Sequence, residues 1–305
     1  MRKKNFIVPH DFTDVANIAL EHAIATAKPL DAEIYLLHVV SKEKEIRNAE
    51  KKLDELIQKH ASSVTLIPSV RLGTIFEDIG DFAAEHHSEL IFMGTHGTHG
   101  WQHLTGMNAL KVVTHSSVPF IIVQEKTAKE TGYDDIVVPL DLNKETKQKL
   151  AIVANIAAYF NSRVHVITPE ETDEFLSHQV KANIVFAKKY FDERGIEVST
   201  TVVPGSGFDK HVIKHAVDNN ADLIAIMNLN KNSVFGSLFS NHEEYMITNN
   251  AQIPTLIMNP IEGSFSFAAD FILIRGSFLY CLPPFGGGFL FNQYNCSFLS
   301  APLLL

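Results

Sequence analysis

Four glycines follow a short apolar run and could bring a phosphate group close to the polypeptide backbone. Residues 90–93 form the apolar run, and Gly94, Gly97, Gly100 and Gly106 come after it. A helix-forming stretch then begins at about Met107. Glycine has no Cβ, so a phosphate can approach its N–H group, and the first turn of the next helix adds unpaired N–H groups and a positive dipole end. The spacing fits a phosphate-binding loop, and it fits a glycine-rich connection without a ligand equally well.

Two side chains near this segment could take part in hydrolysis of a bound phosphate ester. His96 lies within the glycine segment, and Asp11 follows Pro9 at the end of another apolar run. Hydrolysis needs a base and a positioned water, but an aspartate in the place of Asp11 could instead cap a helix. The GxxxxGK[ST] motif, with its phosphate-binding lysine, is absent. The glycine segment therefore argues for binding more strongly than for turnover, and no catalytic residue is assigned.

Histidines in the same segment raise the question of a metal. His96, His99 and His103 are three or four residues apart, a spacing that lets imidazoles share one helical face. The segment starts in a glycine loop, however, so helical spacing cannot be assumed. No cysteine or adjacent carboxylate supports these histidines, and 15 histidines are scattered along the chain. We therefore expect no metal site.

The elements that position these residues are strands alternating with helices. Apolar runs of strand length end at proline, glycine or polar residues, and helical periodicity follows them. This order predicts a parallel, doubly wound α/β sheet, which binds ligands at the carboxyl ends of its strands. Pro68 lies within one strand and suggests an edge position for it. The predicted strands are 5–8, 33–40, 64–72, 90–93 and 120–123, and the predicted helices are 15–27, 42–60, 73–86 and a stretch from about 107.

The same order of elements then begins again, at an offset of about 130 residues, which marks an internal duplication. Pro9 and Asp11 recur as Pro139 and Asp141, and we align Val166 with Val39. A chain of 305 residues is long enough for two such domains. The predicted organisation is a first domain at 1–125, a polar linker at 126–133, a second domain at 134–260 and an atypical tail at 261–305.

The second copy lacks the glycine segment of the first. Asn228 and Asn230 stand in the region of the first two glycines, and their side chains would crowd a phosphate. Two interpretations remain open. The second domain is either a degenerate copy kept for packing or a domain whose pocket has adapted to another small ligand.

Composition narrows the possible partners and compartment. The formal charge of −9 argues against nucleic acid as a partner. The body of the chain has no disulfide framework, because the two cysteines, Cys281 and Cys296, lie near the end, and the first residues do not resemble a secretion signal. A cytoplasmic location is expected. The tail, 261–305, is apolar but is broken too often for a membrane span, so it is either an added strand or hairpin or a non-native extension.

Several stretches resemble the universal stress protein family. They are GTHG at 94–97, SSVPFIIVQ at 116–124, the opening segment NFIVPHDFTDVANIALEHAIATA, and YLLHVV at 35–40. The resemblance implies two tandem domains of Rossmann-like, adenine nucleotide alpha hydrolase-like fold. The family's ATP-binding members usually have Gly-x-x-Gly and, after a spacer, a glycine followed by serine or threonine. Here the spacer is shorter by one residue and Met107 replaces the hydroxyl residue, which puts triphosphate binding in doubt.

The resemblance also implies a site for ATP or another adenine nucleotide. In the family, the aspartate that matches Asp11 lies beside the adenine and ribose, and Val39 would present backbone groups to the base. The glycines would line the phosphates, with Asn108 as the nearest polar side chain to replace the missing hydroxyl. The residues of this implied binding site are Pro9, Asp11, Val39, Met93, Gly94, His96, Gly97, Gly106, Met107 and Asn108.

A stress-response protein acting as a nucleotide-binding or regulatory module is therefore predicted. Two alternatives stay open: a weak nucleotide hydrolase in the first domain, and a ligand-free structural pair. The last strand of each copy, at 120–124 and 255–258, is apolar and would be an aggregation hazard if left bare. In this family that strand commonly pairs the two protomers. We therefore expect the two domains to pack within one chain as a pseudo-dimer, with a homodimer of chains also possible.

Overall fold

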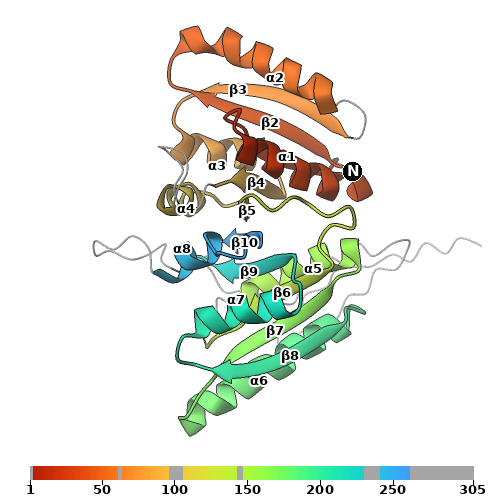
Figure 1. Cartoon of the computed structure of the whole chain (residues 1–305), viewed down its shortest axis with the longest axis vertical. Helices are drawn as coiled ribbons and strands as arrows, with labels where there is room; N and C mark the ends of the chain where they lie inside the picture. The colour runs from red at the N-terminus through yellow and green to blue at the C-terminus, as the bar shows by residue number, and fades with distance from the viewer. Residues whose placement is uncertain (1–2, 61–63, 96–105, 143–146, 230–240, 262–305) are drawn as a thin grey trace, which may run out of the picture. The chain divides into compact units, whose positions relative to one another are not determined.

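The computed structural model describes residues 3–60, 64–95, 106–142, 147–229 and 241–261 (Figure 1). Residues 1–263 form one compact unit and 264–305 another. The predicted tail, apart from Ile261, lies outside the described residues, as do His96, Gly97, His99 and His103. The boundary expected at 126–133 falls inside the first compact unit, so the division into two domains stays a prediction. We refer below to the first half, 1–125, and the second half, 134–260.

The first half has the predicted order of strands and helices. Its strands are β1 (Asn5–Pro9), β2 (Glu33–Val40), β3 (Thr65–Leu72), β4 (Leu90–Gly94) and β5 (Phe120–Val123). Its helices are α1 (Asp14–Ala27), α2 (Ile46–His60), α3 (Ile75–Glu85) and α4 (Gly106–Thr114), with short 3₁₀ turns η1 (Lys28–Leu30) and η2 (Glu43–Glu45). Expected and observed bounds agree within a few residues, because apolar runs and turn residues mark these elements clearly.

The second half repeats this order from strand to strand. Its strands are β6 (Asp135–Pro139), β7 (Arg163–Glu170), β8 (Val198–Pro204), β9 (Leu223–Met227) and β10 (Thr255–Met258). Its helices are α5 (Lys149–Phe160), α6 (Glu174–Asp192), α7 (Phe208–Asp218) and α8 (Asn241–Ile247). The internal duplication read from the sequence is therefore also a duplication of structure.

Within the described residues, the strands of both halves form one ten-stranded sheet (Figure 1). Its order is β3-β2-β1-β4-β5-β10-β9-β6-β7-β8, so β3 is at an edge, as Pro68 suggested. All pairings are parallel except the one between β5 and β10, which is antiparallel with Ile121 opposite Leu256. The pairing expected between the two last strands is thus present. The direction of the strands reverses at this seam.

Alternate residues of each strand face opposite sides of the sheet, as a pleated strand requires. In β1, Phe6 and Val8 join one buried cluster and Ile7 joins the other. The first cluster includes residues of α1, α2, α5 and α6, and the second includes residues of α3, α4, α7 and α8. Both faces of the sheet are therefore covered by helices, which is the doubly wound arrangement. Among the described residues, no helix is long and apolar enough to cross a membrane.

Polar side chains close the seam between the halves. Asn259 donates from Nδ2 to the carbonyl oxygens of Val113 and Ser116, each at 2.7 Å, at the end of α4. Asn228 donates from Nδ2 to Asn259 Oδ1 at 2.8 Å and to Thr114 Oγ1 at 3.2 Å. The carboxyl end of α4 is therefore bonded to residues that follow β9 and β10 of the other half.

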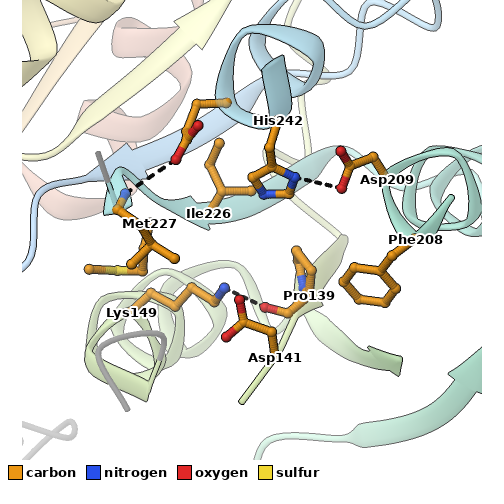
Figure 2. Close-up of a pocket in the computed structure, with 10 residues that line it drawn as sticks. Pro139, Asp141, Lys149, Phe208, Asp209, Ile226, Met227 and His242 are labelled. Atoms are coloured by element: carbon orange, nitrogen blue, oxygen red, sulfur yellow. Dashed lines mark hydrogen bonds and ion pairs between the residues drawn. The ribbon is translucent and has the colours of Figure 1, made fainter. Parts of the chain in front are cut away.

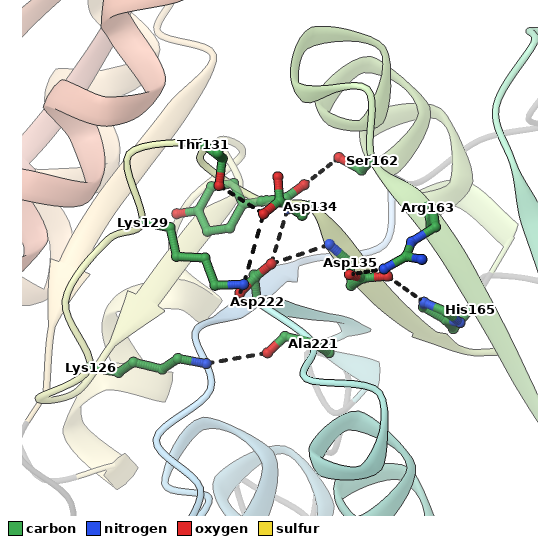
Figure 3. A network of polar contacts seen from close by, with 11 residues as sticks. Lys126, Lys129, Thr131, Asp134, Asp135, Ser162, Arg163, His165, Ala221 and Asp222 are labelled. Carbon is green, nitrogen blue, oxygen red and sulfur yellow. Dashed lines mark hydrogen bonds and ion pairs between the residues drawn. The ribbon is translucent and has the colours of Figure 1, made fainter.

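The segment between the halves is bonded to both of them, and Figure 3 shows its bonds to the second half. Lys129 Nζ lies 2.6 Å from Asp222 Oδ1, and Asp222 Oδ2 accepts from the N–H of Asp134 at 3.0 Å. In the first half, buried His22 donates from Nε2 to the carbonyl of Lys126 at 2.9 Å and accepts at Nδ1 from the hydroxyl of Tyr133 at 3.1 Å. The polar sequence taken for a linker is thus part of the packed structure.

Strand register corrects two alignments between the halves. Pro9 pairs with Leu37 and Pro139 with Ile167, so Val166 corresponds to Leu36 and our alignment of Val166 with Val39 is wrong. Val39 and Val166 each follow a histidine, but the strand pairing fixes the position.

The second correction concerns the lost glycines. The N–H of Thr95 donates to Val123 O and that of Asn228 to Met258 O, both at 2.8 Å, in equivalent places. Met227, rather than Asn228, therefore occupies the position of Gly94.

Candidate functional site

A cavity of about 670 Å³ lies at the carboxyl ends of β1 and β2 in the first half. It is beside the point where strand order reverses, between β1 and β4, which is where doubly wound sheets bind ligands. The strand ends, α2, the turn before α3 and the first turns of α4 contribute to its wall. The described lining residues are Asp11, Phe12, His38, Val39, Val40, Ser41, Glu45, Asn48, Ala49, Lys52, Gly73, Thr74, Ile75, Phe76 and Asn108.

Asp11 is oriented by the start of α1. Its Oδ1 accepts from the N–H of Thr13 at 3.1 Å and from Thr13 Oγ1 at 2.6 Å. Thr13 is itself the N-cap residue and accepts from the N–H of Ala16 at 3.4 Å. Asp11 therefore does not cap the helix directly, but it fixes the residue that does. Its carboxylate is held at the cavity wall on a rigid element.

Phe12 and His38 form an aromatic wall in this cavity. Their ring centroids are 4.7 Å apart, and Lys52 Nζ lies 5.1 Å from the centroid of the Phe12 ring. His38 is fixed because its Nδ1 donates to the carbonyl of His10 at 2.7 Å. Phe12 has a φ of 68°, which is rare for a bulky residue and costs about 1–3 kcal/mol. Such strain is common at functional sites, since the surrounding structure must enforce it.

His10 supports that strained turn from below and is neutral. Its Nδ1 accepts from the N–H of Phe12 at 3.0 Å, which leaves Nε2 to donate to Asn17 Oδ1 at 3.2 Å. Burial lowers the pKa of His10 to about 4, against the opposing influence of Asp11. The hydrogen bond that shapes the Phe12 turn therefore persists throughout the neutral pH range.

The structure brings together some of the residues named from the sequence. Asp11, Val39 and Asn108 line the cavity. Pro9 ends β1 but does not line it, and Met93 is buried in the core of the sheet. Three of the five residues named here thus reach the same space from three different elements.

The glycines named from the sequence occupy different kinds of position. A Cβ on Gly94 would lie 2.6 Å from the carbonyl oxygen of Val15, so this glycine lets α1 pack closely on β4. Gly106 and Met107 begin α4. His96 and Gly97 lie outside the described residues, so their contact with phosphate stays a prediction.

A second cavity, of about 330 Å³, lies at the equivalent strand ends of the second half (Figure 2). Its wall comes from β6, β9, α5, α7 and α8. The described residues that line it are Pro139, Asp141, Lys149, Phe208, Asp209, Ile226, Met227, Leu229, His242 and Glu243. Several replace residues of the first half at matching positions: Lys149 for Ala19, Asp209 for Phe76 and Met227 for Gly94. His242 lies in the first turn of α8, as Asn108 does in α4.

Ionisable side chains dominate this second cavity. The buried ammonium of Lys149 donates to the carbonyl of Pro139 and lies near Asp141 (Figure 2). Burial lowers the pKa of Lys149 to about 8, against the opposing attraction of Asp141. Burial lowers the pKa of His242, but the contact of its Nδ1 with Asp209 Oδ1, at 2.5 Å, has the larger combined effect and raises this pKa above its usual value. Glu243 accepts from the N–H of Leu229 at 3.3 Å.

Sequence reasoning missed the most distinctive residues of both cavities. Phe12, His38 and Lys52 belong to three elements and share no motif, although Phe12 follows directly after Asp11. Lys149 stands among the apolar residues of a helix, and that was the signal available for it. Among the described residues, no group of three or more potential metal ligands is present.

Comparison with known proteins places the first half in a family. Residues 3–124 match the model of the Universal stress protein family. This match covers less than half of the chain, and it shows that the first half is similar to universal stress proteins. A universal stress protein of Methanocaldococcus jannaschii is 28% identical over 142 residues, which are 40% of this chain and 82% of the relative. Universal stress protein G of Escherichia coli O157:H7 is 27% identical over 141 residues, which are 40% of this chain and 99% of the relative.

Solved structures of universal stress proteins resemble the chain as a whole. One from Archaeoglobus fulgidus has a TM-score of 0.68 at 18% identity and covers 85% of this chain and 99% of its own. A putative universal stress protein from Pseudomonas aeruginosa has a TM-score of 0.58 at 18% identity, covering 85% of this chain and 94% of its own. These likenesses confirm the predicted α/β fold. At this identity they carry no information on what either cavity binds.

Proposed function

We propose that the first half binds an adenine nucleotide and that the protein acts as a cytoplasmic regulatory module of the stress response. The observation that carries the proposal is the aromatic wall of Phe12 and His38 beside the Asp11 carboxylate in a cavity at the strand switch point. A flat base can stack on aromatic rings, and a carboxylate can accept hydrogen bonds from ribose hydroxyls. The 670 Å³ volume is in the range of small-molecule sites.

The phosphates are assigned to the side of the cavity where α4 begins. Asn108 lines the cavity in the first turn of that helix, where N–H groups and the dipole favour an anion. Among the described lining residues, Lys52 is the one lysine or arginine, while Asp11 and Glu45 are acidic. Added phosphates therefore gain little, and we expect ATP to bind hardly more tightly than AMP or adenosine.

Binding without turnover is the form of the proposal that the contacts favour. Asp11, the described candidate for a base, accepts two hydrogen bonds at Oδ1 from Thr13, and in this proposal its other oxygen, Oδ2, accepts from the ribose. His10, nearby, uses both ring nitrogens to hold the turn. A hydrolase would need a base with an unengaged lone pair directed at a water. The β5–β10 seam already pairs, within one chain, the strands that commonly pair protomers in this family, so the homodimer that remains part of the proposal would use another surface.

Isothermal titration calorimetry of the full chain with ATP, AMP and adenosine tests the proposal. Phe12→Asn removes the ring but keeps a residue that tolerates the positive φ. We expect this variant to bind adenosine roughly tenfold more weakly. Phe175→Asn is the matched control, because Phe175 is a phenylalanine that is 68% exposed on α6 and far in the fold from this cavity.

Two results would contradict the proposal. One is the absence of binding by all three probes at millimolar concentration. The other is an unchanged affinity in Phe12→Asn with a reduced affinity in a Lys149 variant, which would move the nucleotide to the second cavity.

A further inference from the structure

The second cavity contains a buried cation with unused hydrogen-bonding capacity. Lys149 is 2% exposed and borders the cavity, and among the described residues the carbonyl of Pro139 is the acceptor for its ammonium. An ammonium has three N–H donors. Burying a charged group is costly unless it is paired and hydrogen-bonded. The matching residue of the first half is Ala19, so the fold does not require a lysine at this position. A ligand oxygen in the cavity would complete the shell of this ammonium.

The other charges of the cavity limit what that ligand can be. Among the described lining residues, three carboxylates, Asp141, Asp209 and Glu243, share the cavity with the ammonium of Lys149 and with His242, whose pKa is raised by Asp209. A phosphate ester would add two or more negative charges to this excess. The side chain of Met227, which stands at the position of Gly94, also takes up space in this cavity. The cavity is therefore unsuited to nucleotides.

A ligand with one positive and one negative charge can accept a hydrogen bond from Lys149 without adding to the net negative charge of the cavity. Lys149 and Asp141 lie at one end of the cavity, and the His242–Asp209 pair lies at the other (Figure 2). A ligand carboxylate at the first end would accept from the ammonium, and a ligand ammonium at the second would donate to Asp209. A carboxylate has lone pairs for more than one donor, so Asp209 can keep its bond to His242.

Apolar side chains line the remaining wall. Phe208, Ile226 and Met227 border the same cavity, and its volume of about 330 Å³ is at the small end of the range of ligand sites. We propose that the second cavity binds a small zwitterion with an apolar side chain, of the free α-amino acid class, with its carboxylate on Lys149 and its ammonium on Asp209. This half would then be a second binding module with a different ligand, instead of a degenerate copy.

Calorimetric titration of the full chain with L-leucine, isovalerate and isoamylamine tests the proposal directly. The three share an apolar chain, but isovalerate lacks the amine and isoamylamine lacks the carboxylate. We expect leucine to bind at least about tenfold more tightly than either, because each charge makes a charge-assisted hydrogen bond. Glycine, alanine, valine, methionine and phenylalanine then define the side-chain preference, with apolar side chains expected to bind more tightly than glycine.

Variants assign the binding to this cavity. Lys149→Met should lower leucine affinity at least about tenfold, and Lys149→Arg should retain part of it. Lys52→Met, which changes the lysine of the first cavity, should leave it unchanged. Circular dichroism of each variant verifies that it is folded.

Several outcomes would overturn the proposal. They are equal binding of isovalerate and leucine, unchanged leucine affinity in folded Lys149→Met, displacement of leucine by ATP, and no binding by any of the six amino acids at millimolar concentration. Because nucleotide binding is tested with Phe12→Asn, each proposal can fail without the other.

Discussion

The two halves share a backbone plan but differ at the carboxyl ends of their strands. Both bury alternating aliphatic residues on either side of the sheet, as Ile7 and Val137 do at equivalent positions of β1 and β6. Beside the cavities, in contrast, Ala19 is matched by buried Lys149 and Gly94 by Met227. The sheet interior must fill a fixed space, whereas residues at strand ends face a cavity. A duplicated fold can therefore hold its core constant while its site chemistry changes.

The largest difference in stability between matched variants is expected where the first helix of each half packs on the sheet. We predict that Gly94→Leu destabilises the protein by about 3 kcal/mol or more, because even a Cβ would lie 2.6 Å from Val15 O. The same leucine at the matching position, Met227→Leu, conserves volume and should cost less than about 1.5 kcal/mol. Urea unfolding of the two variants measures the difference. Similar midpoints would mean that α1 does not depend on a glycine beneath it.

The buried lysine should make stability depend on pH in the second half. Its folded-state pKa of about 8 is below the usual 10.5, so between these values the unfolded chain binds more protons and stability rises with pH. From pH 7 to pH 10 this group should contribute about 2–3 kcal/mol, which Lys149→Met removes. The variant should therefore exceed the parent in stability at pH 7 and approach it at pH 10. The free energy of unfolding, measured at both pH values, checks this. Parallel curves for the two proteins would contradict it.

A smaller difference in stability is expected from the residues that precede β4 and β9, the strands next to the point where strand order reverses in each half. Asp222 is buried and bonded to Lys129 and to the N–H of Asp134 (Figure 3). Its counterpart Glu89 forms an exposed ion pair with Lys4, in which Oε2 lies 3.1 Å from Nζ. Asp222→Asn should cost about 2 kcal/mol, since a buried charged acceptor is lost. Glu89→Gln should cost less than about 1 kcal/mol. Thermal unfolding of both variants compares them, and an equal shift in melting temperature would remove the distinction.

Much of the fold could be predicted from the sequence because packing imposes a repeating pattern. Apolar runs marked the strands of the first half, and the repeated Pro-x-Asp of Pro9 and Asp11 revealed the duplication. Register between the copies was less certain, because a run such as that around Val166 looks similar when shifted by a few residues. Strand pairing, which depends on neighbours distant in sequence, shows that Val166 corresponds to Leu36.

The site could be predicted only in part. Asp11 and Val39 were reached through a resemblance, and the structure places both at the first cavity. Phe12 could not be found, because its importance comes from a positive φ and from a ring that meets His38 of another strand. Lys149 was hidden for a related reason. A lysine in a helix is normally solvated, and its burial depends on how the second half packs around it.

The antiparallel seam has a consequence for communication between the two cavities. Strand direction reverses between β5 and β10, so the carboxyl ends of the strands in the first half and those in the second half point in opposite directions. Ligands held in the two cavities cannot touch, and any influence of one on the other must cross the seam. The bond from Asn228, which follows Met227, to Thr114 at the end of α4 offers a physical route. Linkage is reciprocal: if one ligand changes the binding free energy of the other, the second changes that of the first by the same amount.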